Sequence, residues 1–325
     1  MGMDAMLRFK LRRSTLSLML TGAVLLTGSQ IVNAQYVIPG TGQRVENSGD
    51  DFEDEEWTFN ANLPKSSYNI DKQHRQPFGG SENGRWSESP LRGQPDIIKR
   101  VATPTGGLPG SKGSMMMRSL YVGTPGSTGK SSQDDLIFEG SAAYGGVMPV
   151  SSSPSCVVRV FVPDFKEWEQ TTGTSFGLRA AVQARKKSSS SFGRLFRRRS
   201  SSSKVETLYP GFFIQFNSKT DTGEEEDSAV FIIRTDDQGQ DYVGPEVTPG
   251  WWTLGMSFSG DGRISYFASK GVGKLTAADR IGTHLPWGVK VMNVHTIFFN
   301  IANSNRGKWS APWIIDDPEF FYYAQ

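Results

Sequence analysis

Short runs of apolar or alternating residues recur along this chain between turns that contain glycine or proline, and no long stretch has helical periodicity. Runs of this kind are typical of β-strands. The sequence therefore predicts an all-β fold, a two-sheet antiparallel jelly-roll sandwich with long loop insertions. Two short helices are expected at residues 164–170 and 275–281, the second capped by Thr276. The clearest predicted strands are residues 115–122, 156–162, 175–183, 211–217, 229–235, 251–258, 262–269, 295–302 and 313–323.

Three polar segments interrupt the strand pattern. Residues 35–56 are predicted to form a polar, acidic leader, so that a single sandwich domain covers residues 57–325. Residues 61–113 are rich in Pro, Gly, Asn and Arg, and a connection that long usually packs on a sheet or forms a functional surface. In residues 186–204 two serine tracts flank a basic core, which predicts a disordered insertion.

The first 34 residues have the composition of a secretory signal peptide. Four basic residues between positions 8 and 13 precede a mostly apolar stretch, residues 16–32, and the small residue Ala34 precedes Gln35. We therefore expect export to the periplasm or the extracellular space, and no transmembrane span. Removing this segment takes four basic and one acidic residue from totals of 35 and 33, which leaves a nearly neutral chain. Near-neutrality argues against nucleic-acid binding, and the single cysteine, Cys156, excludes an internal disulfide.

Acidic residues lie near both ends of the expected domain. Residues 50–57 read DDFEDEEW, and residues 312–323 read PWIIDDPEFFYY. Carboxylates at the first and last segments suggest that these segments lie side by side, with a cation between them. Paired acids also occur on edge strands as protection against aggregation, so that explanation stays open.

These residues, with Gly110–Ser114 opening an apolar strand, resemble the jelly-roll carbohydrate-binding modules of the family 4/9/22 type and galactose-binding-like sandwiches. The resemblance implies a structural calcium held by Glu53 and Asp317, with a backbone carbonyl near Gly113. The segment WWTLGMSFSGDGRISYFAS, residues 251–269, is similar to a hairpin of concanavalin-like lectin and glucanase sandwiches. Both resemblances imply a sandwich and favour carbohydrate as the partner.

Three of the eight tryptophans lie in polar, glycine-containing contexts. Trp86 follows Arg85, Trp287 lies near His284, and Trp309 follows a Gly-Lys pair. Loop aromatics beside polar side chains can stack on sugar rings, so we predict that Trp86, Arg85, Trp287, His284 and Trp309 contact a glycan. The alternative is that these rings only fix their loops to the sheets.

No motif in the sequence assigns a catalytic residue, and we lean away from an enzyme. The favoured function is an exported carbohydrate-binding protein; the alternatives are a structural envelope or matrix protein without a small ligand, and a glycan hydrolase or lyase on the same scaffold. The basic insertion gives a second possible contact, with an anionic surface. Its candidate residues are Arg194, Arg197, Arg198 and Arg199.

Overall fold

The computed structural model describes residues 36–124, 132–186, 204–303 and 306–324. The predicted signal peptide and the four arginines of the basic insertion lie outside the described residues. Among the described residues, no helix has the length and apolar character that crossing a bilayer requires.

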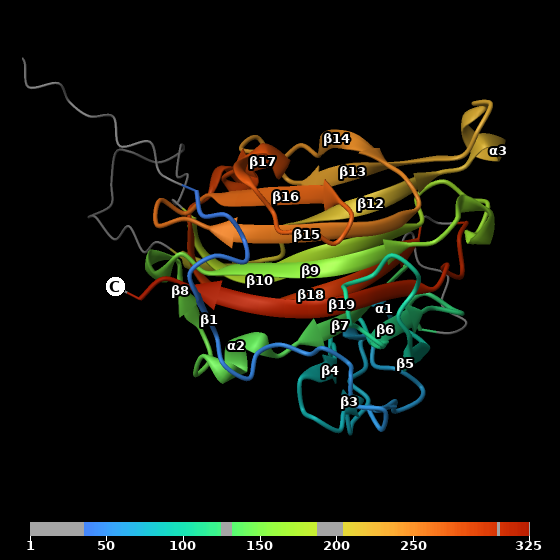
Figure 1. Cartoon of the computed structure of the whole chain (residues 1–325), viewed down its shortest axis with the longest axis horizontal. Helices are drawn as coiled ribbons and strands as arrows, with labels where there is room; N and C mark the ends of the chain where they lie inside the picture. Colours follow the sequence, from blue (N-terminus) through green and yellow to red (C-terminus); the bar gives the residue numbers. More distant parts are fainter. Residues whose placement is uncertain (1–35, 125–131, 187–203, 304–305, 325) are drawn as a thin grey trace, which may run out of the picture. The chain divides into compact units, whose positions relative to one another are not determined.

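Two antiparallel sheets pack face to face, which confirms the predicted all-β sandwich (Figure 1). Sheet A has the order β17-β16-β15-β9-β19-β6-β5, and sheet B the order β14-β13-β12-β10-β18-β7-β4-β3-β2. Off these paths β1 pairs with β19, β11 with β10, and β8 with β18. Sheet A contains β1 (Gln43–Arg44), β5 (Ile97–Ala102), β6 (Gly113–Arg118), β9 (Ser155–Val162), β15 (Gly250–Phe258), β16 (Ile264–Lys270), β17 (Arg280–His284) and β19 (Trp313–Tyr322). Sheet B contains β2 (Phe59–Asn60), β3 (Gly80–Ser81), β4 (Trp86–Glu88), β7 (Ser132–Phe138), β8 (Met148–Pro149), β10 (Ser175–Lys186), β11 (Lys204–Leu208), β12 (Gly211–Asn217), β13 (Ser228–Arg234), β14 (Tyr242–Val247) and β18 (Val291–Asn303).

Helical structure in the described chain is limited to single turns. The α-helices are α1 (Tyr68–Asp71), α2 (Gly140–Ala143) and α3 (Lys219–Thr222). The two helices predicted from sequence are wrong: Phe165–Glu167 and Ala277–Asp279 are 3₁₀ turns. After the first turn Trp168 becomes extended and buried in the core. Thr276 caps the second turn as expected, but the chain then continues as β17 and pairs with β16.

The core lies between the two sheets and is rich in aromatic rings. Trp313 of β19 and Phe176 of β10 belong to opposite sheets, and their ring centroids are 4.6 Å apart. Trp168 packs edge-on against Trp313 at 4.7 Å. Alternate residues of each strand point into this core, which is why the sequence runs alternate or are wholly apolar.

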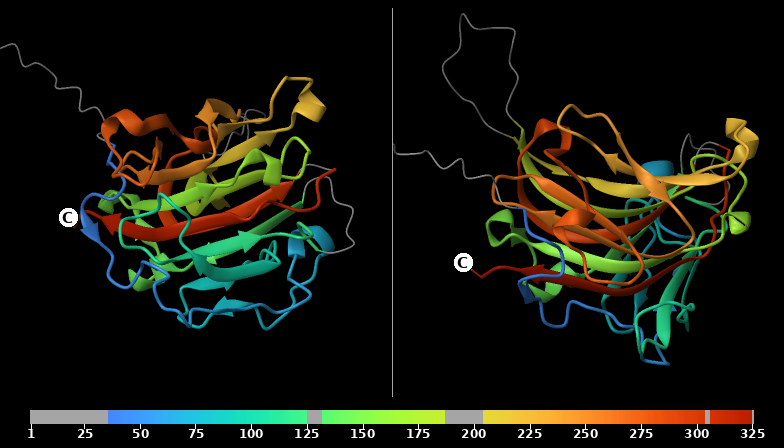
Figure 2. Two further views of the ribbon diagram at one scale, coloured as in Figure 1. Left: turned by 45° about the vertical axis from the view of Figure 1, so that its right-hand side comes forward. Right: turned by 45° about the horizontal axis from the view of Figure 1, so that its top comes forward.

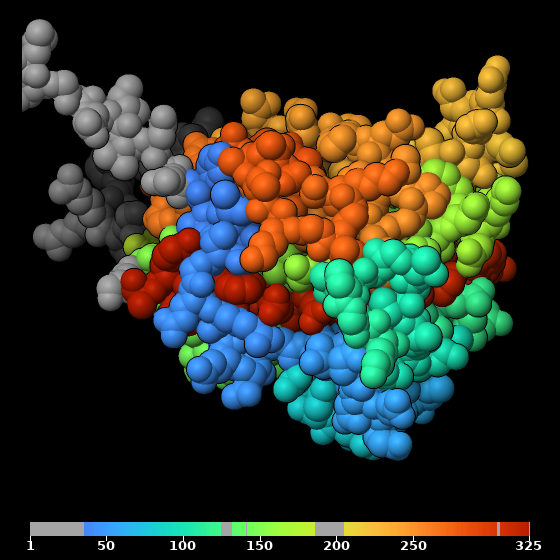
Figure 3. All heavy atoms as spheres, in the orientation of Figure 1, coloured from blue at the N-terminus to red at the C-terminus, as the bar shows by residue number. Residues whose placement is uncertain are grey.

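The first described residues pack on sheet A rather than extending from it. Tyr36 and Ile38 contact a small apolar cluster on the outer face of sheet A, and this segment crosses that face in Figure 3. Gln43 then pairs with Tyr322, so the first and last strands are adjacent, as predicted. Phe52 is fully buried in the core. The segment expected to be a loose leader is therefore part of the packed sandwich over this stretch.

The long connection of residues 61–113 packs against one edge of the sandwich, as Figure 2 shows. Lys65 fixes it there, because its side chain is fully buried and its Nζ lies 2.8 Å from Asp134 Oδ2 on β7. Asp96 lies 3.1 Å from the same nitrogen, and the Tyr121 carbonyl accepts from it at 2.6 Å. A buried charge needs such partners, because an unpaired one is strongly destabilising.

Replacing Lys65 should therefore destabilise the protein. We expect Lys65→Met to lower the free energy of unfolding by about 3–5 kcal/mol, because Asp134 would remain buried without its cation. Urea unfolding followed by tryptophan fluorescence measures this change. The exposed Lys72→Met is the matched control and should change it by less than about 0.5 kcal/mol. Equal effects of the two substitutions would contradict this role for Lys65.

Candidate functional site

The outer face of sheet B carries polar and aromatic side chains in ordered rows. One row runs from Asp135 on β7 through Asn300 and Gly177 to Phe213 on β12, because these residues are direct partners in the sheet register. The next row brings Gln133, Ala302, Ser175 and Gln215 together in the same way. Their neighbours along each strand point to the opposite face and form the core.

Arg179 is the central cation of this face. Its guanidinium lies 5.1 Å from the ring centroid of Phe298 and 5.4 Å from that of Phe213. It donates to the Tyr209 carbonyl at 2.6 Å and to Gln133 Oε1 at 3.4 Å. Only 8% of the residue is exposed, and burial lowers the pKa of Arg179 to about 10. The side chain therefore remains charged at neutral pH and is held in a fixed position.

Asp135 is the neighbouring carboxylate. Gln133 Nε2 donates to its Oδ1 at 2.5 Å, and burial raises the pKa of Asp135 to about 6, although Arg179 opposes the shift. Asp134, the preceding residue, points to the opposite face of β7, where it binds Lys65. Two consecutive acids thus serve two different faces of one strand.

Asn300 is a buried amide without a protein partner. It is 0% exposed, and neither its Oδ1 nor its Nδ2 has a hydrogen-bond partner. A Cβ on Gly177 would clash with Asn300 Oδ1 and with the Phe213 ring, so both groups occupy the space above this glycine. Unpaired buried polar atoms are uncommon in folded proteins, and here they lie beneath the outer face of sheet B.

Two adjoining hollows lie over these rows, and we call them together the sheet B groove. The larger has a volume of about 240 Å³ and the smaller about 70 Å³, and both are lined by Arg92 and Gln133. The remaining lining residues are Asn69, Leu91, Ser132, Asp135, Gly173, Ser175, Arg179, Tyr209, Phe213, Gln215, Ile232, Arg234, Asp241, Phe298, Ala302 and Asn303.

Trp86 and Arg85, two of the predicted contact residues, belong to a buried cluster around Asp50. Trp86 is 1% exposed, stacks on Phe138 and donates its indole N–H to Asp50 Oδ2 at 2.7 Å. The indole of Trp57 donates to the same oxygen at 3.0 Å. Arg85 lies 3.6 Å from the other oxygen of Asp50. The ring of Trp86 is covered by Phe52, Phe138 of β7 and Phe299 of β18.

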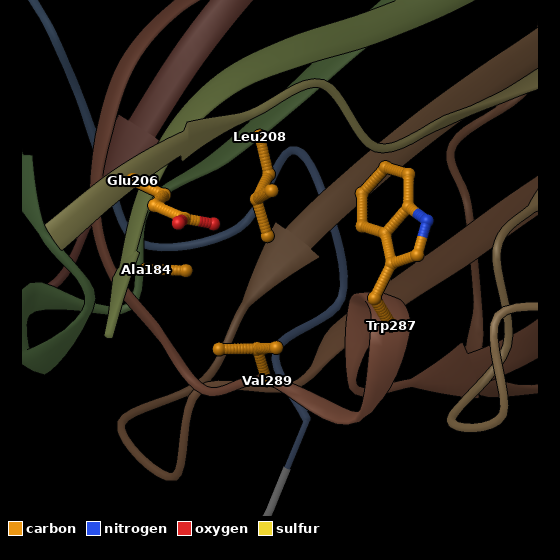
Figure 4. Close-up of a pocket in the computed structure, with 5 residues that line it drawn as sticks. All are labelled: Ala184, Glu206, Leu208, Trp287 and Val289. Atoms are coloured by element: carbon orange, nitrogen blue, oxygen red, sulfur yellow. The ribbon is translucent and has the colours of Figure 1, made fainter. Parts of the chain in front are cut away.

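Trp287 lines a third hollow of about 270 Å³ at the end of the sandwich. Its ring is one wall, and the carboxylate of Glu206 lies on the other side of the space, with Leu208 and Val289 between them (Figure 4). Trp287 is 39% exposed and has a left-handed backbone conformation, with φ 54°. Its backbone amide donates to Thr235 Oγ1. His284 ends β17 three residues earlier, and its buried Nε2 has no partner.

Trp309 lies away from both of these places. It follows β18, whereas Trp287 precedes β18, so the 13-residue strand separates them. Its ring is covered by the Arg118 guanidinium at 5.6 Å, and its backbone amide donates to Glu169 Oε2. The structure therefore places the three predicted tryptophans in three separate locations rather than on one face.

Glu53, one of the two predicted calcium ligands, lies beside residues 111–113, and so does Asp316, the residue that precedes the other predicted ligand, Asp317. Glu53 Oε1 accepts from the amides of Lys112 and Gly113, and the Lys112 bond contributes most to lowering the pKa of Glu53. The Ser111 hydroxyl donates to Asp316 Oδ2 at 2.8 Å. The two ends of the domain are thus joined through hydrogen bonds around Ser111.

This environment fits a calcium ion poorly. Calcium takes six to eight oxygen ligands. The described part of the chain contains no group of three or more His, Cys, Asp or Glu residues placed to hold a metal. Burial raises the pKa of Asp317 to about 6, and the nearby Arg159 is already a cationic partner for it.

Comparison with known proteins finds structural similarity only, at low sequence identity. No protein-family model matches the chain, and neither does any curated protein sequence. Among solved structures, the potassium-bound Emp46p carbohydrate recognition domain is similar, with 9% identity, a TM-score of 0.32, and coverage of 80% of this chain and 97% of that one. A galectin-like protein of unknown function from Bacillus subtilis has 7% identity, a TM-score of 0.35, and coverage of 70% and 90%. An alginate lyase from Pseudomonas aeruginosa has 10% identity, the same TM-score, and coverage of 71% and 87%. No site residue follows from similarities this low.

The sequence analysis missed the residues of the sheet B groove. Arg179, Gln215 and Asn300 stand inside apolar runs that were recognised as strands. Each of these polar residues stands at an alternate position of its run. Such a position points away from the core, so the pattern could have indicated an outer face. None of the three tryptophans predicted as contacts lines the groove.

The Asp135 carboxyl should make stability depend on pH. Its folded pKa of about 6 exceeds its model value of 3.8, so its contribution is fully present below about pH 4 and is lost as pH rises through 6. We expect Asp135→Asn to become more stable relative to the native chain by about 2 kcal/mol between pH 4.5 and 7.5. Urea unfolding at four pH values measures the difference.

Acids common to both proteins cancel in this comparison. The exposed Glu225→Gln should give a difference that does not change with pH in this range. A pH-independent difference for Asp135→Asn would contradict the assignment.

Proposed function

We propose that this protein is exported and binds carbohydrate in the sheet B groove. The observation that carries the proposal is the fixed guanidinium of Arg179 in a groove that is also lined by the amides of Gln133, Gln215 and Asn303. Two buried atoms of groove residues, Asn303 Oδ1 and Arg179 Nε, have no hydrogen-bond partner. Leaving a buried polar atom unpaired costs about 1–3 kcal/mol, so these atoms suit a ligand that supplies partners.

A saccharide has the chemistry that this groove complements. Its hydroxyl groups both donate and accept hydrogen bonds, and its C–H faces pack on aromatic rings. The groove offers amide groups from Gln133, Gln215 and Asn303, and the ring of Phe213 lies among them. A few polar groups converging on a concave, partly aromatic surface are typical of ligand sites.

Binding is favoured over cleavage because the groove carboxylates are already committed to neighbours. Asp135 accepts a hydrogen bond from Gln133, and Asp241 lies 3.6 Å from Arg234. Hydrolysis of a glycoside requires a proton donor and a second carboxylate that is free to act across the bond. A purely structural protein, in turn, gains nothing from an unpaired polar floor.

Trp287 stays a predicted contact, in the hollow at the end of the sandwich, and His284 stays one outside the lining of that hollow. The exposed indole and the Glu206 carboxylate across the space could hold a further sugar unit by stacking and hydrogen bonding. The prediction that a glycan contacts Trp86, Arg85 and Trp309 rests on the sequence alone.

A glycan array followed by calorimetry with the best ligand tests the proposal. The full chain without its predicted signal peptide should bind at least one glycan, and Gln215→Ala should weaken binding about fivefold to tenfold through one lost hydrogen bond. Gln43→Ala, an amide removed from β1 of sheet A, is the matched control and should leave affinity unchanged.

Trp287→Ala separates the two hollows. Weaker binding by this variant alone would move the site from the groove to the end of the sandwich. Melting curves of each variant show that it is folded. A chain that binds no glycan on the array would contradict the proposed function.

Calcium at Glu53 and Asp317 stays a prediction that thermal melts decide. A bound ion would bridge the two ends of the domain and raise the melting temperature by several degrees over EDTA, whereas the poor fit of the described carboxylates favours coincident curves. The full chain is melted in both conditions at neutral pH. Coincident curves would leave the hydrogen bonds around Ser111 as the link between the ends.

A further inference from the structure

We propose that the glycan bound in the sheet B groove is acidic, with carboxylate groups that contact the guanidinium of Arg92 and its neighbours. This inference rests on the proposed function and adds the class of sugar. It follows from the three guanidinium groups that line the groove and from Arg92, whose side chain makes no hydrogen bond or ion pair with a described residue.

Three guanidinium groups line the groove. Arg179 lines the smaller hollow, Arg234 the larger, and Arg92 both. Arg92 and Arg234 each repel the charge of Arg179 and add to the effect of burial in lowering its pKa. Like charges held this close destabilise one another unless negative charge lies between them.

The carboxylates of the groove compensate this charge only in part. Asp241 lies beside Arg234, at 3.6 Å. Asp135 has a pKa raised to about 6 by burial, and no oxygen of it lies within 4.0 Å of a described Arg or Lys nitrogen. Three cations face two acids, so the groove has a net positive charge at neutral pH although the whole mature chain is nearly neutral.

Arg92 is the cation of the groove that is bonded to no side chain, although its charge attracts Asp135. It is half-buried, and its side chain makes no hydrogen bond or ion pair with any described residue. An arginine has five N–H donors in a planar fork that matches a carboxylate. Arg179 also has a free donor, because its buried Nε is unpaired.

The backbone holds Arg92 in place before any ligand arrives. Its turn is tied to β7, because the Asp135 amide donates to the Gly93 carbonyl at 2.9 Å and the Gly93 amide donates to the Ser89 carbonyl at 2.7 Å. Gly93 has φ 81°, and a Cβ there would clash with the Ser66 carbonyl beside the buried Lys65. A fixed backbone limits the positions that the guanidinium can reach, which reduces the conformational entropy lost when an anion binds.

Paired polysaccharides test the charge separately from the sugar. Several polyuronates, each with its carboxyl-reduced and therefore neutral counterpart, are titrated into the full chain without its predicted signal peptide. We expect at least one acid form to bind tenfold or more tighter than its reduced form, with affinity falling between 50 and 300 mM NaCl.

Variants of Arg92 connect this preference to the groove. Arg92→Gln should reduce binding of the acid form at least tenfold and leave the reduced form unchanged, whereas Arg92→Lys should have a smaller effect. Arg280→Gln removes a cation from β17 of sheet A and should change neither affinity. Melting curves confirm that each variant is folded.

The outcomes separate this inference from the proposed function. Equal or tighter binding of the reduced forms, or binding only to neutral glycans on the array, would overturn the acidic class and keep the carbohydrate site. If Arg92→Gln still prefers the acid form as strongly as the native chain, the inferred contact between Arg92 and the carboxylate is also overturned. Failure to bind any member of the panel or the array would overturn both.

Discussion

The buried ion pair between Lys65 and Asp134 is the contact on which one whole side of the molecule depends. It fixes a long and mostly irregular connection against β7, at a point where a cation without a partner would not be tolerated. The next residue of β7, Asp135, faces the opposite way and forms part of the groove. The same dipeptide therefore anchors the turn that carries Arg92 and supplies the acid beside it.

The sandwich could be predicted because the alternation of apolar and polar residues within each strand is visible in a short stretch of sequence. Inward-facing residues such as Phe212, Ile214 and Phe216 alternate along one strand, and the predicted run 211–217 is β12 with the same bounds. The fold of residues 61–113 was not predictable, because it depends on distant partners. The buried position of Lys65 has a meaning only when β7 lies beside it. The two predicted helices failed for a similar reason, since pairing in sheet A and burial of Trp168 outweighed local propensity.

The site was harder to predict than the fold. Trp86 looked like a contact residue in a polar loop, but Asp50 accepts its indole N–H and the ring is buried. Arg179 and Asn300 looked like exceptions within apolar strands. Their positions in the sequence place them on an outer face, but their approach to one another requires the order β12-β10-β18-β7. Strand order in a sandwich with several crossings between sheets is not contained in any single segment.

Gly177 has a consequence for recognising related chains. Its missing side chain leaves the volume in which the Asn300 amide and the Phe213 ring lie, so the three positions are sterically interdependent across neighbouring strands. In a divergent relative a larger residue at this position should occur only where its two partners have also changed. These three positions should therefore change together in related chains, and an alignment guided by structure can test this where sequence identity is low.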